Sequence, residues 1–364
     1  MESNYGKFAE LLFRTHYNNY ALPEEVKSKL YPLRDWIKGH IPQKLYRYRT
    51  FSKYSIEALK NDEIWGSSIM TFNDPYECLP YYDITEVNTY ISNEFSVDVV
   101  KRNFDRIASN NMPPKFLNAF PKELIEKLKT VKMDIPTVEQ LSKIMPKIMS
   151  IFVNYWQVNL SELDIQFFSE VLNYARMYHI ACFSETNSSI LMWSNYANNH
   201  TGFCVEYDIK SALCDCSEKC ADVCYCPGIM LSNMIAPVIY QDTRYDASLG
   251  FMSMLMNWTI DVNNWPFDKI YYDMLSVIKG MLVKGKEWEY EKEWRLFKCP
   301  GTNQFIKHKL ITKMKPTAVY LGTSITPHNK ARLKNICRKK EIPCYQMNPQ
   351  FYSTKFEFIP FEIK

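Results

Sequence analysis

The sequence predicts an α+β fold with a mixed, mainly antiparallel β core that is interrupted by a helical insertion. Three observations lead to this prediction. Short segments with a period of two, typical of half-buried strands, recur on both sides of a long stretch with helical periodicity. Glycine is scarce, with 10 residues in 364, and the motifs GxGxxG and GxxxxGK[ST] are missing, which argues against a Rossmann or P-loop fold. The chain is 46% hydrophobic and 15% aromatic, enough for a large core.

The N-terminal part begins with a helical segment and continues as a strand, a helix and a second strand. Residues 1–40 are predicted to be helical, because their apolar residues recur at helical spacing. The segment "KLYRYRTF" then alternates, which places Arg47 and Arg49 on one strand face and tyrosines on the other. A helix capped by Ser52 or Ser55 follows, and "IWGSS" returns as a strand before the turn "FNDPYE".

The later part of the core also alternates strands and helices. "YHIACFSE" and "TGFCVEYDI" are predicted strands on either side of a short helix, Ile190 to Tyr196, which Ser188 or Ser189 can cap. A strand at "IAPVIYQ" and helices around residues 247–284 come next. The tail is a β, α, β run, "AVYLG", "HNKARLKNICRKK" and "IPCYQM", followed by a terminal strand at "KFEFIPFEI".

Four regions follow from this pattern. Residues 1–40 form an N-terminal helical segment, and residues 41–86 and 179–364 form one α+β core of catalytic type. Residues 87–178 are a helical insertion, since "VEQLSKIMPKIMSIFVNYW" and its neighbours have helical periodicity that only "NNMPPK" and "DIP" break. A cysteine-rich loop at residues 211–228 lies within the core.

The charge balance and the termini limit the partners that the sequence predicts. Forty-four basic and 40 acidic side chains give a net charge of +4, too even for wholesale binding of nucleic acid or membrane surfaces, although a local basic patch is compatible with it. No stretch approaches the ~20 apolar residues of a membrane span, and "MESNYGKFAELLF" does not resemble a signal peptide. We therefore expect a cytoplasmic protein without a membrane partner, and the sequence does not indicate its oligomeric state.

Five of the 11 cysteines lie in "CDCSEKCADVCYC", as Cys214, Cys216, Cys220, Cys224 and Cys226. Four thiolates at this density can hold a structural zinc ion. The spacing does not match the CxxC pairs of zinc fingers, so the sequence favours unliganded thiols over a zinc site, and disulfide or redox chemistry is a third alternative.

The segment "EWEYEKEWRLF" is the first candidate for chemistry. If it is a strand, a period of two places Glu289, Glu291, Glu293 and Arg295 on one face. Carboxylates ~7 Å apart raise one another's pKa where water is excluded. The alternative is an exposed strip that neutralises itself. Glu293 favours the functional interpretation, because it lies at the mouth of the apolar strand "EWRLF".

Other candidates come from three short segments. Arg47 and Arg49 either clamp an anion bidentately or form a solvated strand face. Asn73 and Asp74 either contact a ligand or only make a turn. The residues at helical spacing in the predicted short helix form either core or the rim of a pocket; these are Trp193, Tyr196 and His200.

Three blocks of the sequence resemble a known bacterial family. "LYRYRTFSKYSIEALKNDEIWGSSIMTFNDPYE", "CFSETNSSILMWSNYANNHTGFCVEYD" and "YEKEWRLF" look like the family catalogued as domain of unknown function 2971, from about residue 44 to 325. The name carries no activity. The resemblance implies a setting in phage defence or abortive infection.

A more distant resemblance is to the ADP-ribosyltransferase fold, and it implies a split sheet that binds NAD without a GxGxxG loop. In that fold a first strand presents Arg, a later strand presents Ser, and a further strand presents an E-x-E pair. The matching residues here are Arg47 or Arg49, Ser184, and Glu291 with Glu293. The resemblance implies that an arginine holds the NAD pyrophosphate, that Ser184 orients the nicotinamide ribose, and that Glu293 stabilises the oxocarbenium-like charge. Arg295, Asn73, Asp74 and the aromatic residues of the short helix would complete the nucleotide site. "CFSE" departs from the S-T-S triplet of many members.

The leading hypothesis is therefore an ADP-ribosyltransferase-like enzyme that uses NAD, acting as a phage-defence or toxin-type effector on nucleic acid or protein. One rival is a non-enzymatic module that binds a nucleotide or nucleic acid. Another is a metal-dependent nuclease with Asp74, Glu206 and Glu293 around Mg²⁺.

Overall fold

The computed structural model describes residues 5–16, 23–81, 83, 126, 178–211, 235–248, 273, 275–298 and 308–363. In this part of the chain, helices accompany a large and mostly antiparallel sheet, so the predicted α+β class is confirmed. Almost all of the predicted helical insertion, residues 87–178, lies outside the described residues, as does the cysteine-rich loop apart from Ser211. Among the described helices, none has the length and apolar character needed to cross a membrane.

Among the described residues, the main sheet has ten strands: β1 (Leu45–Arg49), β2 (Glu63–Ser68), β3 (His179–Ser184), β4 (Phe203–Tyr207), β5 (Ile235–Pro237), β8 (Glu293–Lys298), β9 (His308–Lys313), β10 (Ala318–Leu321), β11 (Cys344–Pro349) and β12 (Phe358–Glu362). Their order is β12-β11-β10-β4-β1-β3-β2-β9, and β8 joins β3 to β5. In the described part of this sheet, β10 and β11 pair in parallel and the other pairs are antiparallel. The predicted strand "IAPVIYQ" is divided at Val238, because β6 (Ile239–Gln241) pairs instead with β7 (Val283–Gly285).

The helices are α1 (Gly6–Arg14), α2 (Pro23–His40), α3 (Lys53–Lys60), α10 (Ile190–Tyr196), α14 (Ser276–Leu282) and α15 (Pro327–Lys340), with 3₁₀ turns η1 (Ile69–Thr71) and η4 (Lys286–Glu291). The predicted caps are confirmed for two of them. Ser52 caps α3 and forms a reciprocal capping box with Ser55, and Ser189 caps α10 by accepting from the Met192 amide.

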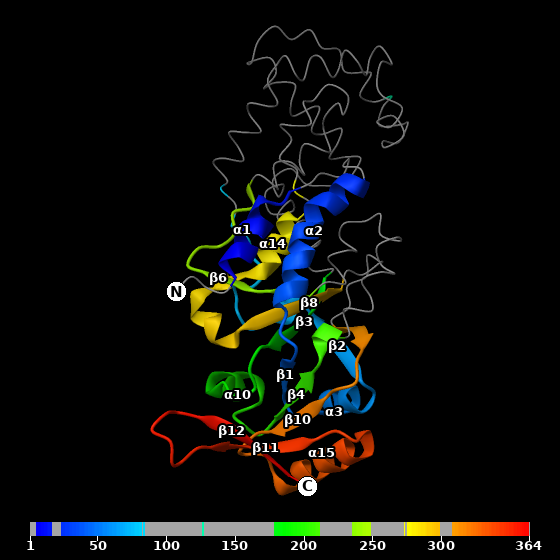
Figure 1. Ribbon diagram of the computed structural model, residues 1–364, viewed down its shortest axis with the longest axis vertical. Helices are drawn as coiled ribbons and strands as arrows, with labels where there is room; N and C mark the ends of the chain where they lie inside the picture. The colour runs from blue at the N-terminus through cyan, green and yellow to red at the C-terminus, as the bar shows by residue number, and fades with distance from the viewer. Residues whose placement is uncertain are drawn as a thin grey trace.

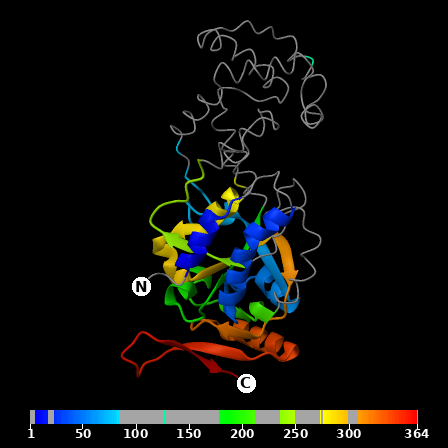
Figure 2. The ribbon, with the colours of Figure 1, turned by 45° about the horizontal axis from the view of Figure 1, so that its top comes forward.

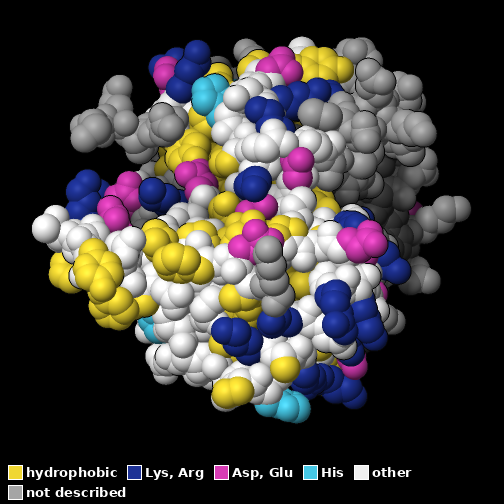
Figure 3. All heavy atoms as spheres, turned by 60° about the horizontal axis from the view of Figure 1, so that its bottom comes forward, with side chains coloured by type: hydrophobic (Ala, Val, Ile, Leu, Met, Phe, Trp, Pro, Cys, Tyr) yellow, Lys and Arg dark blue, Asp and Glu magenta, His cyan; other side chains and the backbone are white. Residues whose placement is uncertain are grey.

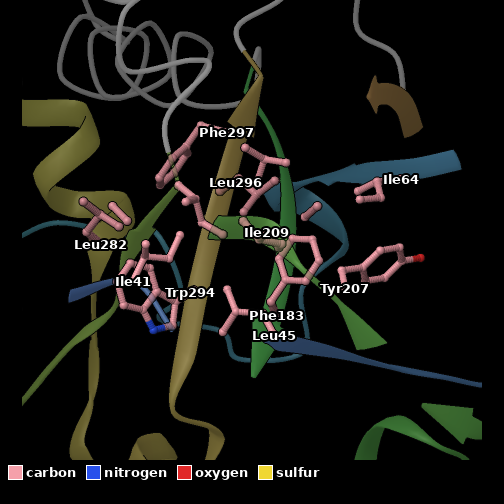
Figure 4. Close-up of a cluster of buried hydrophobic side chains, with 14 of the residues drawn as sticks. Ile41, Leu45, Ile64, Phe183, Tyr207, Ile209, Leu282, Trp294, Leu296 and Phe297 are labelled. Carbon is pink, nitrogen blue, oxygen red and sulfur yellow. The ribbon is translucent and has the colours of Figure 1, made fainter. Parts of the chain in front are cut away.

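One face of the sheet carries the main hydrophobic core. Alternation along the strands places Leu45, Phe183 and Trp294 on the same face, since they occupy equivalent positions on β1, β3 and β8. Figure 4 shows these three side chains in one cluster with Ile41. Residues from α1, α2, α3 and α15 join this cluster, so these helices cover the face.

The opposite face carries a smaller core beneath α10. Trp193 from this helix packs edge-on against Tyr48 of β1, with ring centroids 5.2 Å apart, and Cys204 of β4 belongs to the same cluster. The polar residues described below lie on this second face.

The C-terminal elements β10, α15, β11 and β12 form one end of the described core, and α1, α2 and α14 form the other (Figures 1 and 2). The hairpin of β11 and β12 projects from the first end. Its connection carries three almost fully exposed aromatic residues: Phe351, Tyr352 and Phe356.

Candidate functional site

The "FNDPYE" turn delivers a buried carboxylate to the second face of the sheet. The Asp74 side chain accepts a hydrogen bond from the Tyr76 amide at 2.9 Å, and the Asp74 carbonyl accepts one from the Glu77 amide at 3.1 Å. These bonds close the turn that the sequence predicts. Glu77 follows directly, and its side chain is buried against Arg295 and Lys284.

Two further carboxylates come from the segment between β7 and β8. The prediction of a continuous strand here is wrong: residues Lys286–Glu291 form the 3₁₀ turn η4, and β8 begins only at Glu293. Lys292 between them adopts a left-handed backbone with φ 46°, which is unusual for a residue with a side chain. The reversal brings Glu291 and Glu293 to the same lysine, Lys284, while Glu289 is exposed.

Two cations hold the three carboxylates together. Arg295 donates to both oxygens of Glu293, from Nε to Oε1 at 3.0 Å and from Nη2 to Oε2 at 2.9 Å, and it also pairs with Glu77. The Nζ atom of Lys284 lies 2.6 Å from Glu291, 3.1 Å from Glu77 and 3.4 Å from Glu293. All five side chains are buried, and the group has one more acid than base. We call these five residues the charged cluster.

The charged cluster separates the pKa values of its two neighbouring glutamates. Burial alone would raise the pKa of Glu293, but Arg295 and Lys284 outweigh it and bring that pKa to about 2. Burial raises the pKa of Glu291, and the negative charge of Glu293 adds to this, so that Lys284 compensates only in part and the pKa lies at about 7. Glu293 is therefore an ionised group at neutral pH, and Glu291 is poised to exchange a proton.

Glu291 connects the charged cluster to the surface. The Tyr196 hydroxyl donates to Glu291 Oε1 at 2.5 Å and lies 3.3 Å from the side-chain nitrogen of the exposed Asn73. Beside them, the side-chain amide of the exposed Asn195 donates to the Tyr290 hydroxyl at 3.0 Å. The rim therefore presents amide and hydroxyl groups, and ligand binding by Asn73 and Tyr196 stays a prediction.

Ser184 contacts the site through the backbone of Glu291. It lies opposite Glu293 in the β3–β8 pair and is fully buried. Its hydroxyl donates to the Glu291 carbonyl at 2.6 Å and accepts from the Thr186 amide at 3.3 Å. These bonds make Ser184 a positioning residue that fixes the end of η4.

The structure does not bring Arg47 and Arg49 to Glu293, although the ADP-ribosyltransferase resemblance assigns an arginine of this strand and Glu293 to one nucleotide site. Tyr46 is opposite Ser184, and Ser184 is opposite Glu293, so these three side chains share a face. Arg47 and Arg49 alternate with Tyr46 and point to the other face, where the Arg47 guanidinium lies 5.3 Å from the Phe183 ring centroid and donates to the Trp65 carbonyl. Burial lowers the pKa of both arginines.

The predicted stripe of Trp193, Tyr196 and His200 is also not one helical face. The helix ends at Tyr196, and residues 198–200 all have positive φ, so His200 leaves the helix. Trp193 is fully buried and donates to the Asn187 carbonyl at 2.7 Å, while His200 stacks on it. Burial lowers the pKa of His200, which favours a neutral ring. Of the three, Tyr196 contacts the charged cluster, and the others support the helix from below.

The carboxylates of the predicted nuclease site are far apart. Glu206 of β4, Tyr46 of β1, Ser184 of β3 and Glu293 of β8 form a row across the sheet, which separates the two glutamates by three strand spacings, about 14 Å. Glu206 is instead bonded to Lys44, Thr317 and Tyr320. Within the described ranges, no group of three or more His, Cys, Asp or Glu side chains could hold a metal ion. The five cysteines predicted as zinc ligands lie outside them.

Local sequence patterns do not single out Glu77 or Lys284. Glu77 is visible only as the last residue of the "FNDPYE" turn, and Lys284 lies in "VKGKEW", where nothing marks it as buried. Glu77 joins the charged cluster through contacts with residues that are distant in sequence, and Lys284 meets Glu291 and Glu293 because of the reversal at η4; no spacing rule reports either arrangement.

Comparison with known proteins supports one of the two resemblances. Curated proteins and solved structures give no match to the chain. Residues 192–296 match the model of a family described as protein of unknown function (DUF2971). The matched segment includes the end of α10, β4 and the residues Glu291, Glu293 and Arg295, whereas the ADP-ribosyltransferase resemblance stays a prediction. The match supports the resemblance to the DUF2971 family over this segment of the chain.

Proposed function

We propose that this protein cleaves the nicotinamide N-glycosidic bond of NAD and transfers ADP-ribose to an acceptor, as an ADP-ribosyltransferase-like enzyme. The observation that carries the proposal is the buried pair of Glu291 and Glu293, which share Lys284 at 2.6 and 3.4 Å while Arg295 holds both oxygens of Glu293; these surroundings lower the pKa of Glu293 to about 2 and raise that of Glu291 to about 7. Neighbouring acids with separated pKa values are typical of sites where one stabilises charge and the other moves a proton.

Glu293 would supply the electrostatic stabilisation. When the bond between C1′ and the nicotinamide nitrogen breaks, its electron pair leaves with nicotinamide and the ribose becomes oxocarbenium-like. A fixed carboxylate in a water-poor site stabilises such a cation far better than one in water. Arg295 holds both oxygens of Glu293, so the carboxylate needs no reorientation during the reaction.

Glu291 would act as the general base. The acceptor forms a bond to C1′ and loses a proton, and the ionised Glu291 carboxylate accepts that proton and later releases it to water. Tyr196 and Asn73 lie between Glu291 and the surface, and their hydroxyl and amide groups suit the hydroxyls of a ribose or the nicotinamide carboxamide.

The pH dependence of nicotinamide release tests the role of Glu291. Below a pH of about 7 its carboxyl group keeps a proton and cannot accept another, so the rate should fall about tenfold per pH unit on the acid side. Glu291→Gln should lower the rate and remove this acid limb. The matched control is Glu289→Gln, which changes an exposed glutamate of the same turn and should keep the limb. An unchanged limb in Glu291→Gln would assign the titration to another group.

The pyrophosphate of NAD needs a cation other than Arg47 or Arg49, and Arg244 is the candidate. Its guanidinium is exposed and lies 5.6 Å from the ring centroids of both Tyr76 and Tyr81. Tyr76 directly precedes Glu77, so Arg244 lies beside the turn that contributes Glu77 to the charged cluster. Arginine is suited to phosphate because its fork donates two parallel hydrogen bonds.

Arg244→Gln should raise the KM for NAD roughly tenfold, a loss of about 1.4 kcal/mol, with little change in kcat. Such a pattern is expected for a contact made equally in the ground state and the transition state. Initial rates of nicotinamide release over a range of NAD concentrations give both constants. Arg14→Gln, which removes an exposed arginine from α1, is the control and should leave KM unchanged. A lower kcat at constant KM would move Arg244 out of the binding role.

A further inference from the structure

Helix α15 concentrates positive charge at the C-terminal end of the core. It carries six basic residues and no acidic one: Lys330, Arg332, Lys334, Arg338, Lys339 and Lys340. Its apolar side chains, Leu333, Ile336 and Cys337, are buried in the core. The six positive charges of this helix exceed the net charge of the whole chain, which is +4.

Helix α3 lies beside α15 and extends the basic surface. Phe51, just before α3, has its ring centroid 5.4 Å from the guanidinium of Arg332 in the first half of α15, and Asp62, just after α3, pairs with Lys340 at the end of α15 at 2.7 Å. The two helices therefore run side by side in the same direction. Helix α3 adds two exposed lysines, Lys53 and Lys60, against one exposed glutamate, Glu57, and it also carries Tyr54, which is 82% exposed. We call this surface the α3–α15 face, and Figure 3 shows lysine and arginine side chains gathered on that end of the molecule.

Several of these cations are not neutralised by the protein. Lys330, Lys334 and Lys339 make no salt bridge with a carboxylate in the ranges that the structure describes, and Arg338 donates only to the neutral Asn335. Lys330, Lys334 and Arg338 are four residues apart, so they lie along one helical face at a rise of about 6 Å per step. This rise is close to that of two nucleotides of a B-form strand, about 6.8 Å.

We propose that the α3–α15 face binds the phosphate backbone of nucleic acid. A row of unpaired lysines and an arginine matches a regularly charged polyanion, and the exposed Asn335 and Tyr54 add hydrogen-bonding and stacking groups. An anionic membrane fits less well, because a helix that lies on a bilayer needs an exposed apolar face and the apolar residues of α15 are buried. The inference does not rest on the proposed NAD chemistry, since neither helix contributes to the charged cluster.

The test is a binding titration of the full chain with a labelled duplex DNA, and separately a single-stranded RNA, of about 20 nucleotides, across a salt series. Fluorescence anisotropy gives Kd at each salt concentration. The triple variant Lys334→Gln, Arg338→Gln and Lys339→Gln should weaken binding roughly 10²-fold near 0.1 M salt and reduce the slope of log Kd against log salt by about 2 to 3.

A matched triple, Lys7→Gln, Arg14→Gln and Lys38→Gln, removes the same charges from exposed positions on α1 and α2 at the other end of the core. It should leave the affinity within about twofold of the wild type. Equal losses in the two triples would show that only net charge matters and would overturn the site. Absence of binding by the wild type would also overturn it. If phosphatidylserine vesicles or poly-glutamate bind as tightly, and the first triple weakens that binding as much, the ligand of the α3–α15 face is another polyanion and not nucleic acid.

Discussion

Glu293→Gln should reduce nicotinamide release from NAD by roughly 10²- to 10³-fold, the cost of removing one preorganised electrostatic group from a transition state. The substitution keeps the shape of the side chain and removes the negative charge that would stabilise the oxocarbenium-like ribose. NAD affinity should change little, because the ground-state ribose carries no such charge. Steady-state release assays and a separate binding measurement, such as calorimetry, distinguish the two effects.

The controls for Glu293→Gln address its burial between Arg295 and Lys284, because a neutral amide removes a carboxylate that both cations share and leaves only Glu77 and Glu291 to compensate them. Glu293→Asp keeps the charge and shortens the side chain, so it should remain folded and still lose most of the rate. Glu289→Gln, at an exposed position nearby, should behave as the wild type. Full activity of a folded Glu293→Gln protein would rule out the proposed chemistry, and so would the absence of nicotinamide release from folded wild-type protein.

Arg295→Met should lower the free energy of unfolding by about 3–5 kcal/mol, the usual cost of removing one partner from a buried ion pair. Arg295 is fully buried and pairs with Glu77 and Glu293, so its loss leaves two buried carboxylates with only Lys284 beside them. The pKa of Glu293 is depressed from 4.5 to about 2, so the stability from its ion pairs is complete above pH 4.5 and is lost as the pH falls toward 2. Urea denaturation at neutral pH, monitored by tryptophan fluorescence, measures the change.

A second substitution separates lost charge compensation from lost packing. Glu77→Gln in the Arg295→Met background removes one of the stranded carboxylates, and it should recover about 1–3 kcal/mol. Arg338→Met, at an exposed position of α15, should change stability by less than about 0.5 kcal/mol. If Arg295→Met costs no more than this control, the charged cluster does not hold β8 to the "FNDPYE" turn.

Much of the sheet could be predicted because its strands follow the period of two. Alternation in "KLYRYRTF" placed β1 correctly and also separated its arginines from its tyrosines. Alternation along β1 does not show whether its arginines share a face with Glu293, because that depends on the register between β1, β3 and β8, and this register places them on opposite faces. Register is a property of pairing between distant segments, and one strand does not specify it.

Helix α10 shows where local signals end. Its start was predictable, because Ser189 is a good cap before an apolar segment, and its end was not. "NYANNH" contains asparagines that tolerate left-handed backbone, and Asn198, Asn199 and His200 all use it. The predicted stripe extends into this turn, so His200 was placed on a helical face that does not exist.

The charged cluster could be predicted only in part. E-x-E and the neighbouring Arg295 are visible in "EKEWR", but the turn η4 and the left-handed Lys292 decide that both glutamates face Lys284. That Lys284 and Glu77 belong to the charged cluster depends on how the whole chain folds. The predicted helical insertion and the zinc ligands of the cysteine-rich loop stay predictions, since they lie outside the described residues apart from single positions.

The outer edge of β12 has a consequence for self-association. The amide of Ile363 donates to the Cys344 carbonyl of β11, so alternation turns the amides of even-numbered residues of β12 outward. The middle outward position is Pro360, which has no N–H to offer. Phe356 and Phe361 beside this edge are exposed, and an intact row of donors next to such aromatic residues would invite a second copy to add a strand. Pro360 interrupts that row, and this disfavours the addition of a further strand at the edge.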